Sequence, residues 1–560
     1  MSTNARRLDP VDVAIVGLGA AGGIAALVLT QSGLRVEGIE AGPDLGREEA
    51  LFDELANDYR NRLGSAKANQ EVPTWRPDST RESTTGYEGR IVSLMGNGVG
   101  GGTVHYAGQH FRLAPWHFRL RSATEARYGQ GTLPGDCTAT DWPATYDDLE
   151  PYYARVEEEL GVSGIAGVNP FEGPRSSPYP LAPLRRTGWT ELIASTAQHA
   201  GLHPFAGPAA IRSTPYRGLA ACTYCGFCNW NGCHVGAKGS THVTVIPQAR
   251  ATGQLTLTTE ARVVSIETGT QGKVSGVTYV KAGELLFRPA RAVFLSAHTF
   301  ENTRLLLLSR SRAFPEGLAN RAGQVGRNAM SQVFVGVDGV FPGRSLNRFG
   351  GTYPQATSLD DWNADNFDHS GLGFVGGGCI SAIHEAKPIQ TALSTPSSIP
   401  RYGREWKRWL AAHGNSVGRL MAISESLPYE DSFLDLDPAV TDSTGMPVVR
   451  MTYRLHDQEL RRFDFLHERM SELLLEAGAA ETWTSFRRLP AAPFQSVFGA
   501  TRMGTDPASS VTDATCVAHE VPNLAIVGAS SFPTSGGYQP TATIQALAWR
   551  AAERLVEILR

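Results

Sequence analysis

The sequence of 560 residues has no run of about 18 consecutive apolar residues, the length that a membrane-spanning helix needs. It also has no excess of one charge, because 51 Lys and Arg face 55 Asp and Glu, for a formal net charge of −4. Basic runs, heptad arrays and internal repeats are absent. These absences exclude a helical membrane span and argue against a surface for nucleic acid or an anionic membrane.

The N-terminal sequence does not have the pattern of a secretory signal peptide. The first apolar stretch follows residues 1–7 directly, is broken by glycines and is typical of a strand and helix rather than a signal peptide. A cytoplasmic location is therefore expected. The apolar fraction of 41% and the charged fraction of 19% are those of a globular protein, and the length suggests two to four domain-sized units.

The order of predicted elements indicates one α/β domain that is interrupted by other material. An apolar run over 11–17, a helix over 22–32 and a strand over 34–40 form a βαβ unit. Further elements are a hairpin of 255–266 with 274–281, a strand over 292–297, a helix over 299–309, strand-like pieces at 332–340 and 448–453, a helix over 456–477, a strand over 523–527 and a helix over 541–559. The chain thus opens and closes with α/β segments and carries α+β material between them.

A glycine motif joins the first predicted strand to the first helix. Gly17 permits a tight turn, Gly19 lets the main chain approach a pyrophosphate, and Gly22 lets helix and strand pack closely. Ala20 and Ala21 fill the positions between, where free N–H groups of the helix favour phosphate. Glu40 ends the next strand, where its carboxylate suits ribose hydroxyls. The motif predicts dinucleotide binding, although a plain strand–helix turn remains the alternative and FAD is not separated from NAD.

Three further blocks resemble the glucose–methanol–choline (GMC) oxidoreductases. They are Gly96-Asn-Gly-Val-Gly-Gly-Gly-Thr-Val-His105-Tyr-Ala-Gly, the segment Thr501-Arg-Met-Gly-Thr-Asp-Pro, and Asn523-Leu-Ala-Ile-Val-Gly528-Ala-Ser-Ser-Phe-Pro-Thr-Ser-Gly-Gly-Tyr-Gln539-Pro540-Thr541. Their details are similar to the branch that acts on sugars and sugar acids, with pyranose oxidases and gluconate dehydrogenase-like subunits. The resemblance implies FAD, held by a discontinuous Rossmann-like domain, and a substrate domain built on an antiparallel sheet.

The resemblance also implies which residues would hold the flavin. A histidine at the place of His105 carries a covalent flavin link in some relatives, and packing beside the flavin is the other reading. Besides the first glycine motif and Glu40, the implied positions are Gly96, Val99, Gly100, Gly101, Thr103, His105, Val263, Gly528, Ala529, Gln539, Pro540 and Thr541.

The same order of blocks predicts how the chain is divided. The expected segments are 8–118 (FAD-binding, with an irregular insert at 45–90), 119–215 (substrate or cap), 216–325 (cysteine-rich loop and FAD-binding), 326–495 (substrate domain) and 496–560 (FAD-binding, with the active-site positions).

The chain departs from the family where a histidine usually takes the hydroxyl proton. Counting back eight residues from Gly504 gives Ser496, and the partner position is Gln539. A serine hydroxyl is a poor proton acceptor at neutral pH, whereas an imidazole suits that task. A base could come from His105, Tyr538, His110 or a substrate-domain acid. Alternatively, the substrate needs no protein base, or the reaction is not alcohol oxidation.

Four of the seven cysteines lie close together, at Cys222, Cys225, Cys228 and Cys233. The first three match the opening of a ferredoxin-type run, but the last spacer is longer and His234 stands where proline is expected. An iron–sulfur cluster, a zinc site and a structural loop without metal are the three interpretations. In some GMC dehydrogenases a cluster near this place passes electrons to a cytochrome.

The leading prediction is an FAD-dependent oxidoreductase for a hydroxyl of a sugar, polyol or glycoside-type metabolite. Hydride would pass to flavin N5, with oxygen or a partner protein as the electron acceptor. The alternatives are a lyase, isomerase or oxidative cyclase acting on a natural product, and an electron-transferring dehydrogenase subunit.

Overall fold

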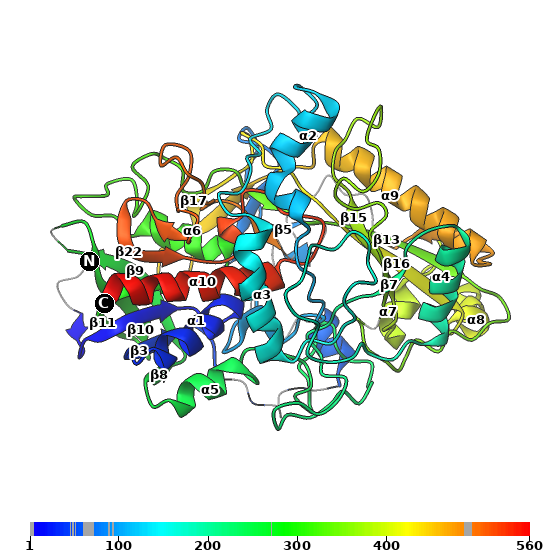
Figure 1. The fold of residues 1–560 in the computed structure, drawn as a ribbon, viewed down its shortest axis with the longest axis horizontal. Helices are drawn as coiled ribbons and strands as arrows, with labels where there is room; N and C mark the ends of the chain where they lie inside the picture. The colour runs from blue at the N-terminus through cyan, green and yellow to red at the C-terminus, as the bar shows by residue number, and fades with distance from the viewer. Residues whose placement is uncertain are drawn as a thin grey trace.

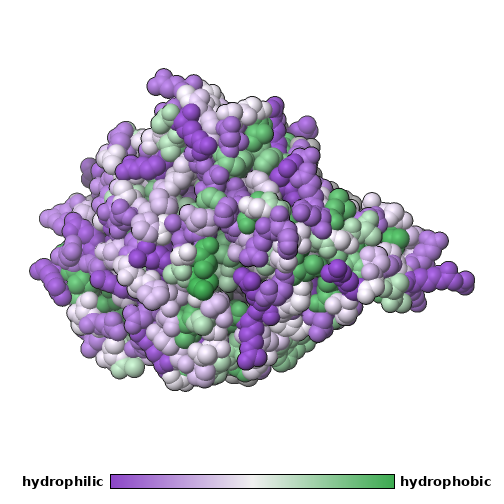
Figure 2. Space-filling view, turned by 45° about the vertical axis from the view of Figure 1, so that its right-hand side comes forward, coloured by the Kyte–Doolittle hydropathy of each residue, from purple (hydrophilic) through white to green (hydrophobic). Residues whose placement is uncertain are grey.

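The structure is a computed structural model that describes residues 5–44, 46, 50, 52–59, 72–87, 90–91, 95–269, 271–354, 356–485 and 496–560. The predicted insert at 45–90 and the end of the segment 326–495 therefore lie partly outside the described residues. Figure 2 shows a face with mainly hydrophilic residues, on which hydrophobic ones form small separate groups. None of the helices within the described ranges has the length and hydropathy to cross a membrane.

A parallel sheet with an antiparallel edge forms the first layer of the protein (Figure 1). Its main path runs through β21 (Val517–Ala518), β22 (Val521–Ile526), β11 (Glu284–Leu295), β2 (Val11–Val16), β3 (Val36–Ile39) and β8 (Leu255–Thr258). The strands from β22 to β8 are mutually parallel. First and last parts of the chain thus meet in one sheet, as the sequence predicts.

Helix α1 (Ala20–Gln31) covers this sheet together with α10 (Thr541–Leu559), which packs directly against it. Figure 1 shows the two helices side by side, with both termini of the chain at the same end. Helix α1 is buried over Ala21–Thr30 because it is apolar on every side, as expected for a helix between a sheet and a second helix. Helix α10 ends where it was predicted to end.

The predicted hairpin of 255–266 with 274–281 is wrong in one respect. Residues 255–266 do not form one strand: β8 joins the parallel sheet, and β9 (Ala261–Thr268) begins a separate antiparallel hairpin with β10 (Val274–Lys281). The break lies at Glu260, which adopts φ 52° in the left-handed region. The alternation of side chains continues across the break, so periodicity alone could not find it.

A second sheet is antiparallel throughout, in the order β19 (Glu481–Thr484), β13 (Val333–Val340), β16 (Val417–Ser424), β15 (Gly378–Ile383), β14 (Thr357–Leu359) and β7 (Phe205–Ala206). Helix α9 (Asp457–Glu476) lies across β13 and β16. Its buried stripe of Phe463, Leu466 and Met470 shares a core with Val335 and Leu420. The predicted fold class, α/β plus α+β with an antiparallel second domain, is therefore confirmed.

A third sheet contains β17 (Phe433–Thr441), β18 (Pro447–Thr452) and β4 (Thr74–Arg76). Strand β4 was not expected, because it lies within the insert that the sequence predicts to be irregular. Other helices are α2 (Leu120–Tyr128), α3 (Tyr146–Leu160), α4 (Gly188–His199), α5 (Val245–Ala251), α6 (Thr299–Leu308), α7 (Pro388–Leu393) and α8 (Gly403–His413). The remaining short strands are β1 (Arg6–Arg7), β5 (Gly86–Tyr87), β6 (Arg90–Ile91), β12 (Met330–Ser331) and β20 (Val497–Phe498).

The contact of α1 with β2 can be tested at Gly22. A Cβ there would lie 2.0 Å from the carbonyl oxygen of Gly17, so Gly22→Ala must push helix and strand apart. We expect the free energy of unfolding to fall by about 1–3 kcal/mol, measured by thermal denaturation. Gly188→Ala is the matched control, since a Cβ there meets no atom within 4 Å. Equal stability of the two variants would contradict the packing described here.

Candidate active site

The first glycine loop has the geometry that a dinucleotide requires. Gly17 adopts φ 87°, and a Cβ there would lie 2.8 Å from the carbonyl oxygen of Ser296. Helix α1 begins at Ala20 and Ala21 without a side-chain cap at Gly19, so its first N–H groups remain available to a ligand. A Cβ on Gly19 would meet only the Cα of Gly101, at 3.7 Å. The loop is therefore open at the point where a pyrophosphate would lie.

The second glycine loop packs against the first with main chain on main chain. Gly100 donates its N–H to the carbonyl of Leu18 at 2.8 Å, and a Cβ on Gly101 would lie 2.8 Å from the Cα of Gly19. Gly102 is exposed and has open space where a Cβ would be. Two glycine loops thus form a shallow cradle at the N-terminus of α1, which fits a flat dinucleotide such as FAD.

Hydroxyl groups fasten this cradle to the segment before α5. Thr103 donates to the carbonyl of Gly100 at 2.6 Å and lies 2.9 Å from the hydroxyl of Ser240. Thr241 donates to the carbonyl of Gly19 at 3.2 Å. Val99 is fully buried below the loop. Loops that are far apart in the sequence are therefore held as one unit.

Glu40 is buried at the end of β3, beside this cradle. Its carboxylate accepts the N–H groups of Leu18 at 2.9 Å and Gly42 at 3.0 Å. Burial raises the pKa of Glu40, and these N–H groups oppose that effect. The carboxylate thus shapes the glycine loop itself, in addition to the ribose contact that the sequence predicts for it.

His105 lies under the second glycine loop, where its Cε1 is 2.9 Å from the Cβ position of Gly96. Its ring stacks on Trp230, with centroids 5.9 Å apart and planes 7° apart. Burial lowers the pKa of His105 to about 4, with a smaller effect from Lys238, and Nδ1 has no hydrogen-bond partner in the described part of the chain. The ring is therefore neutral; a covalent flavin link at His105 stays a prediction.

The C-terminal block supplies a second open helix end. Helix α10 begins at Thr541 after Pro540 and, like α1, has no side-chain cap. Gly528 adopts φ 155°, and the atom nearest to its Cβ position is 3.6 Å away, on Asn302. The carbonyl of Ala529 accepts the N–H of Gly499 at 3.1 Å, so the 499–503 segment runs beside this block. These contacts leave a second helix N-terminus, that of α10, available to a ligand.

Gln332 links the two expected catalytic positions, and the sequence did not single it out. Its main-chain N–H donates to the carbonyl of Ser496 at 3.0 Å, and its Nε2 donates to the carbonyl of Tyr538 at 2.7 Å. The half-buried side chains of Ser496 and Gln539 make no hydrogen bond to a described residue. The Oε1 atom of Gln332 is buried and also lacks a described partner. Gln332 therefore ties the main chain of Ser496 to that of Tyr538, the residue before Gln539.

Two of the candidate bases are already committed to structural contacts. The Tyr538 hydroxyl donates to Asp360 at 2.8 Å. Burial raises the pKa of Tyr538 well above its ordinary value, and the charge of Asp360 adds to this effect. The Nε2 atom of His110 lies 3.0 Å from Oε1 of Gln545 on α10, and burial lowers the pKa of His110. Neither group is placed as a ready proton acceptor.

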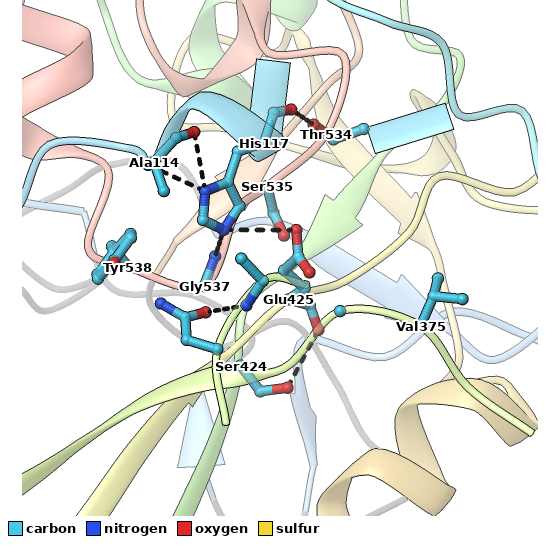
Figure 3. Close-up of polar contacts among 12 residues, drawn as sticks. Ala114, His117, Val375, Ser424, Glu425, Thr534, Ser535, Gly537 and Tyr538 are labelled. Carbon is cyan, nitrogen blue, oxygen red and sulfur yellow. Dashed lines mark hydrogen bonds and ion pairs between the residues drawn. The ribbon is translucent and has the colours of Figure 1, made fainter. Parts of the chain in front are cut away.

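Two further titratable residues, His117 and Glu425, lie behind the turn that leads to Gln539 (Figure 3). The His117 Nε2 atom is 3.9 Å from Oε1 of Glu425 and 3.2 Å from the main-chain N of Gly537. Neither residue is singled out by the sequence pattern. The available signal was the place of Glu425 directly after the buried strand β16, because a carboxylate is seldom fully buried unless it is paired.

The cysteine loop lies beside His105, whose carbonyl accepts the N–H of Trp230 at 2.8 Å. All four thiols are free; Cys228 is buried, and Cys222, Cys225 and Cys233 are half-buried. Burial raises the pKa of Cys222 to about 11, and Cys233 and Cys225 add to it. Within the residues that the structure describes, no three His, Cys, Asp or Glu side chains are grouped so that they could hold a metal ion.

A buried lysine connects this loop to the second glycine loop. The Nζ atom of Lys238 donates to the carbonyls of Tyr106 at 2.8 Å, Cys228 at 2.9 Å and Asn231 at 2.7 Å. All three ammonium protons are thus used by main-chain oxygens. Val263, predicted to contact adenine, lies half-buried in β9 at a small cavity that Arg262 and Arg304 also line.

With this geometry established, comparisons with known proteins identify the family. Models of the GMC oxidoreductase family match residues 208–333 (N-terminal model) and 428–548 (C-terminal model). The gluconate 2-dehydrogenase flavoprotein of Pantoea cypripedii is 33% identical, over 99% of this chain and 95% of that protein. The chain is a GMC oxidoreductase. It is accordingly an FAD-dependent enzyme, and the predicted family is confirmed.

Other members of the GMC family agree over almost the whole length. The 2-methyl-1,2-propanediol dehydrogenase of Mycolicibacterium austroafricanum is 29% identical, over 99% of this chain and 96% of that protein. Among solved structures, pyridoxine 4-oxidase from Mesorbium loti has a TM-score of 0.62 at 18% identity, covering 97% of this chain and 98% of that chain. At that identity the likeness supports the fold alone.

The role of Lys238 can be tested by Lys238→Met, which keeps the length of the side chain but removes the donors. Three buried carbonyls would lose their partner, so we expect a loss of about 3 kcal/mol or more in a chemical unfolding curve. Lys273→Met is the control, because Lys273 is exposed and its loss should cost less than about 0.5 kcal/mol. Similar curves for both variants would show that the loop is not held through Lys238.

Proposed function

We propose that this GMC oxidoreductase oxidises a hydroxyl group of a sugar, polyol or glycoside-type metabolite. The observation that carries the proposal is the cradle of two glycine loops between the uncapped ends of α1 and α10, beside the Ser496–Gln539 position. Two relatives of similar length support the substrate class, since their names are those of dehydrogenases for a sugar acid and a diol.

In this proposal the helix N-termini and glycine loops hold the dinucleotide, and Glu40 faces its ribose. FAD, when bound, would supply the acceptor for the hydride of the substrate, which carries both electrons of the oxidation. The chain's own contribution is orientation: the Gln539 amide and the Ser496 hydroxyl offer hydrogen bonds to a substrate oxygen. Because Ser496 replaces the usual histidine, proton removal has no dedicated imidazole at this position, which should make the chemical step slow.

A visible spectrum of the purified protein before and after denaturation tests the cofactor. We expect flavin absorbance, and release of the flavin on denaturation shows whether the link is covalent. Anaerobic addition of aldonic acids, polyols and glycosides should then bleach the flavin for at least one of these classes. A yellow protein that none of them bleaches, yet that turns over another substrate, would favour a lyase, isomerase or cyclase.

Ser496→His tests whether the missing imidazole limits the rate. A general base at this position contributes typically about 10²–10⁴-fold, so we expect the variant to reduce its flavin at least about 10²-fold faster with an alcohol substrate. The control is Ser496→Asn, which adds similar bulk and no proton acceptor. Stopped-flow absorbance under anaerobic conditions measures both. Equal rates for the two variants would place the base elsewhere.

For the cysteine loop we propose a structural role in preference to an iron–sulfur cluster or zinc. Lys238 and Glu385 support it, because they satisfy the carbonyl and the N–H of Cys228 through direct bonds. Determination of iron, zinc and acid-labile sulfide in the purified protein tests this. Stoichiometric iron and sulfide would instead support an electron-transferring subunit that passes electrons to a partner protein.

A further inference from the structure

Glu425 carries a carboxylate that the fold buries without neutralising it. The residue follows β16 and is 1% exposed, and among the residues described neither carboxylate oxygen has a hydrogen-bond partner of normal geometry. The charge of Arg462 and the main chain of Gly377 oppose the effect of burial on its pKa only in part. Arg462 lies nearby, but it donates to the carbonyls of Val375 and Glu425 and to the Ser424 hydroxyl. A buried carboxylate without partners costs several kcal/mol when ionised, so a purely structural role explains it poorly.

The surrounding main chain is shaped to admit this side chain. A Cβ on residue 376 would lie 1.8 Å from Oε2 of Glu425, so Gly376 leaves the space that the carboxylate fills. Trp116 closes the same space from the other side, with its Cη2 3.6 Å from that Cβ position. The imidazole of His117 faces this carboxylate, with Nε2 3.9 Å from Oε1, where the charge of Glu425 acts on the position of the imidazole proton (Figure 3).

The ring of His117 receives two main-chain N–H groups, one at each nitrogen. Ala114 N lies 3.0 Å from Nδ1, and Gly537 N lies 3.2 Å from Nε2. A neutral imidazole has one acceptor nitrogen, so it satisfies one of these N–H groups at a time. When Nε2 accepts from Gly537, the proton on Nδ1 faces the Ala114 carbonyl at 3.3 Å. When Nε2 carries the proton instead, that proton faces Glu425.

Gly537 lies in the turn that presents Gln539 at the proposed substrate position. Other bonds of this turn are fixed: the Ser535 hydroxyl accepts from Ser426 N at 2.7 Å, and the Gly537 carbonyl accepts from Cys379 N at 3.2 Å. Tyr538 is held by Asp360 and Gln332. Two bonds of this turn have a titratable partner: the Tyr538 hydroxyl donates to Asp360, whose pKa is raised by burial, and the Gly537 N–H donates to His117.

We propose that His117 and Glu425 are positioning residues of the active site: the charge of Glu425 sets the tautomer of His117, the tautomer decides whether the Gly537 N–H is held, and this bond determines where Gln539 lies. The effect on substrate rests on the proposed function, whereas the effect on the turn does not. One proton leaves for the solvent when Glu425 ionises. The imidazole of His117 carries one proton before and after, because the proton lost at Nδ1 is matched by the one taken up at Nε2.

The direction of the pH effect follows from the two groups. Burial raises the pKa of Glu425 to about 7 and lowers that of His117 to about 4, so His117 stays neutral while Glu425 titrates. Below pH 7, Glu425 is uncharged and Nε2 accepts from Gly537. Above pH 7, the carboxylate attracts the proton of Nε2–H, and Gly537 loses its acceptor. The facing groups from other elements, Arg462, Glu459 and Tyr538, are already engaged in hydrogen bonds.

Hydrogen–deuterium exchange measured by mass spectrometry tests this in the full-length protein, with and without added FAD. The peptide that contains Gly537 should lose protection about fivefold between pH 6 and pH 8.5, after correction for intrinsic exchange, because one hydrogen bond of average strength is lost. Protection that does not change over this range in the wild-type protein would overturn the proposal, whatever the variants do.

Three variants test the separate roles of Glu425 and His117 in this exchange experiment. Glu425→Gln cannot ionise, so protection of the Gly537 peptide should become independent of pH. His117→Ala removes the acceptor, so protection should be low at every pH. Glu54→Gln is the matched control: this buried carboxylate accepts the N–H groups of Ile389 and Gln390 and contacts neither the pair nor the turn. It should keep the wild-type pH dependence, and an unchanged midpoint in Glu425→Gln would refute the role of Glu425.

Flavin measurements separate this proposal from the proposed function. If the protein binds no FAD, the proposed function fails, but the exchange experiment without FAD still tests the pair. If FAD is bound and reduced by a substrate, the rate of reduction in the wild-type protein should change with the same midpoint near pH 7. Loss of that midpoint in Glu425→Gln, with substrate affinity unchanged, would support positioning of Gln539.

Discussion

The close contact of main chain with main chain at the two glycine loops is the constraint on which the rest of the structure depends. Gly22 lies against Gly17, and Gly101 lies against Gly19, at separations that leave no room for a Cβ. These contacts fix α1 on β2 and place the second loop over the N-terminus of α1. Because glycines occupy the contact positions of the cradle, a dinucleotide can approach the main-chain N–H groups and the positive end of the helix.

Segments distant in the sequence reach this cradle through polar bridges. Lys238 joins the cysteine loop to the second glycine loop by three carbonyl contacts, and Gln332 joins the Ser496 segment to the turn of Tyr538. Each bridge satisfies buried main-chain groups that water cannot reach. The same bridges set the geometry of the active site, so stability and function are coupled through a few buried polar side chains.

Protonation at this site is governed by burial more than by charge pairs. His105 and His117 lose basicity because their rings are fully enclosed, while Glu425 holds its proton more firmly for the same reason. With Ser496 in place of the usual histidine, the polar groups at the substrate position are neutral. His117 contacts the main chain of the turn at Gly537, and Glu425 lies next to His117.

The sequence by itself determined the family, the cofactor and most of the first sheet, because glycine spacing and strand–helix periodicity are local signals. It also predicts Ser496 and Gln539 as active-site positions. Only the tertiary structure separated β8 from β9 at Glu260 and placed β4 in a sheet, since both depend on partners far along the chain. It alone brought Glu425 beside His117. Their proximity joins β16 to the segment before α2, and no local pattern encodes a contact between residues so far apart in sequence.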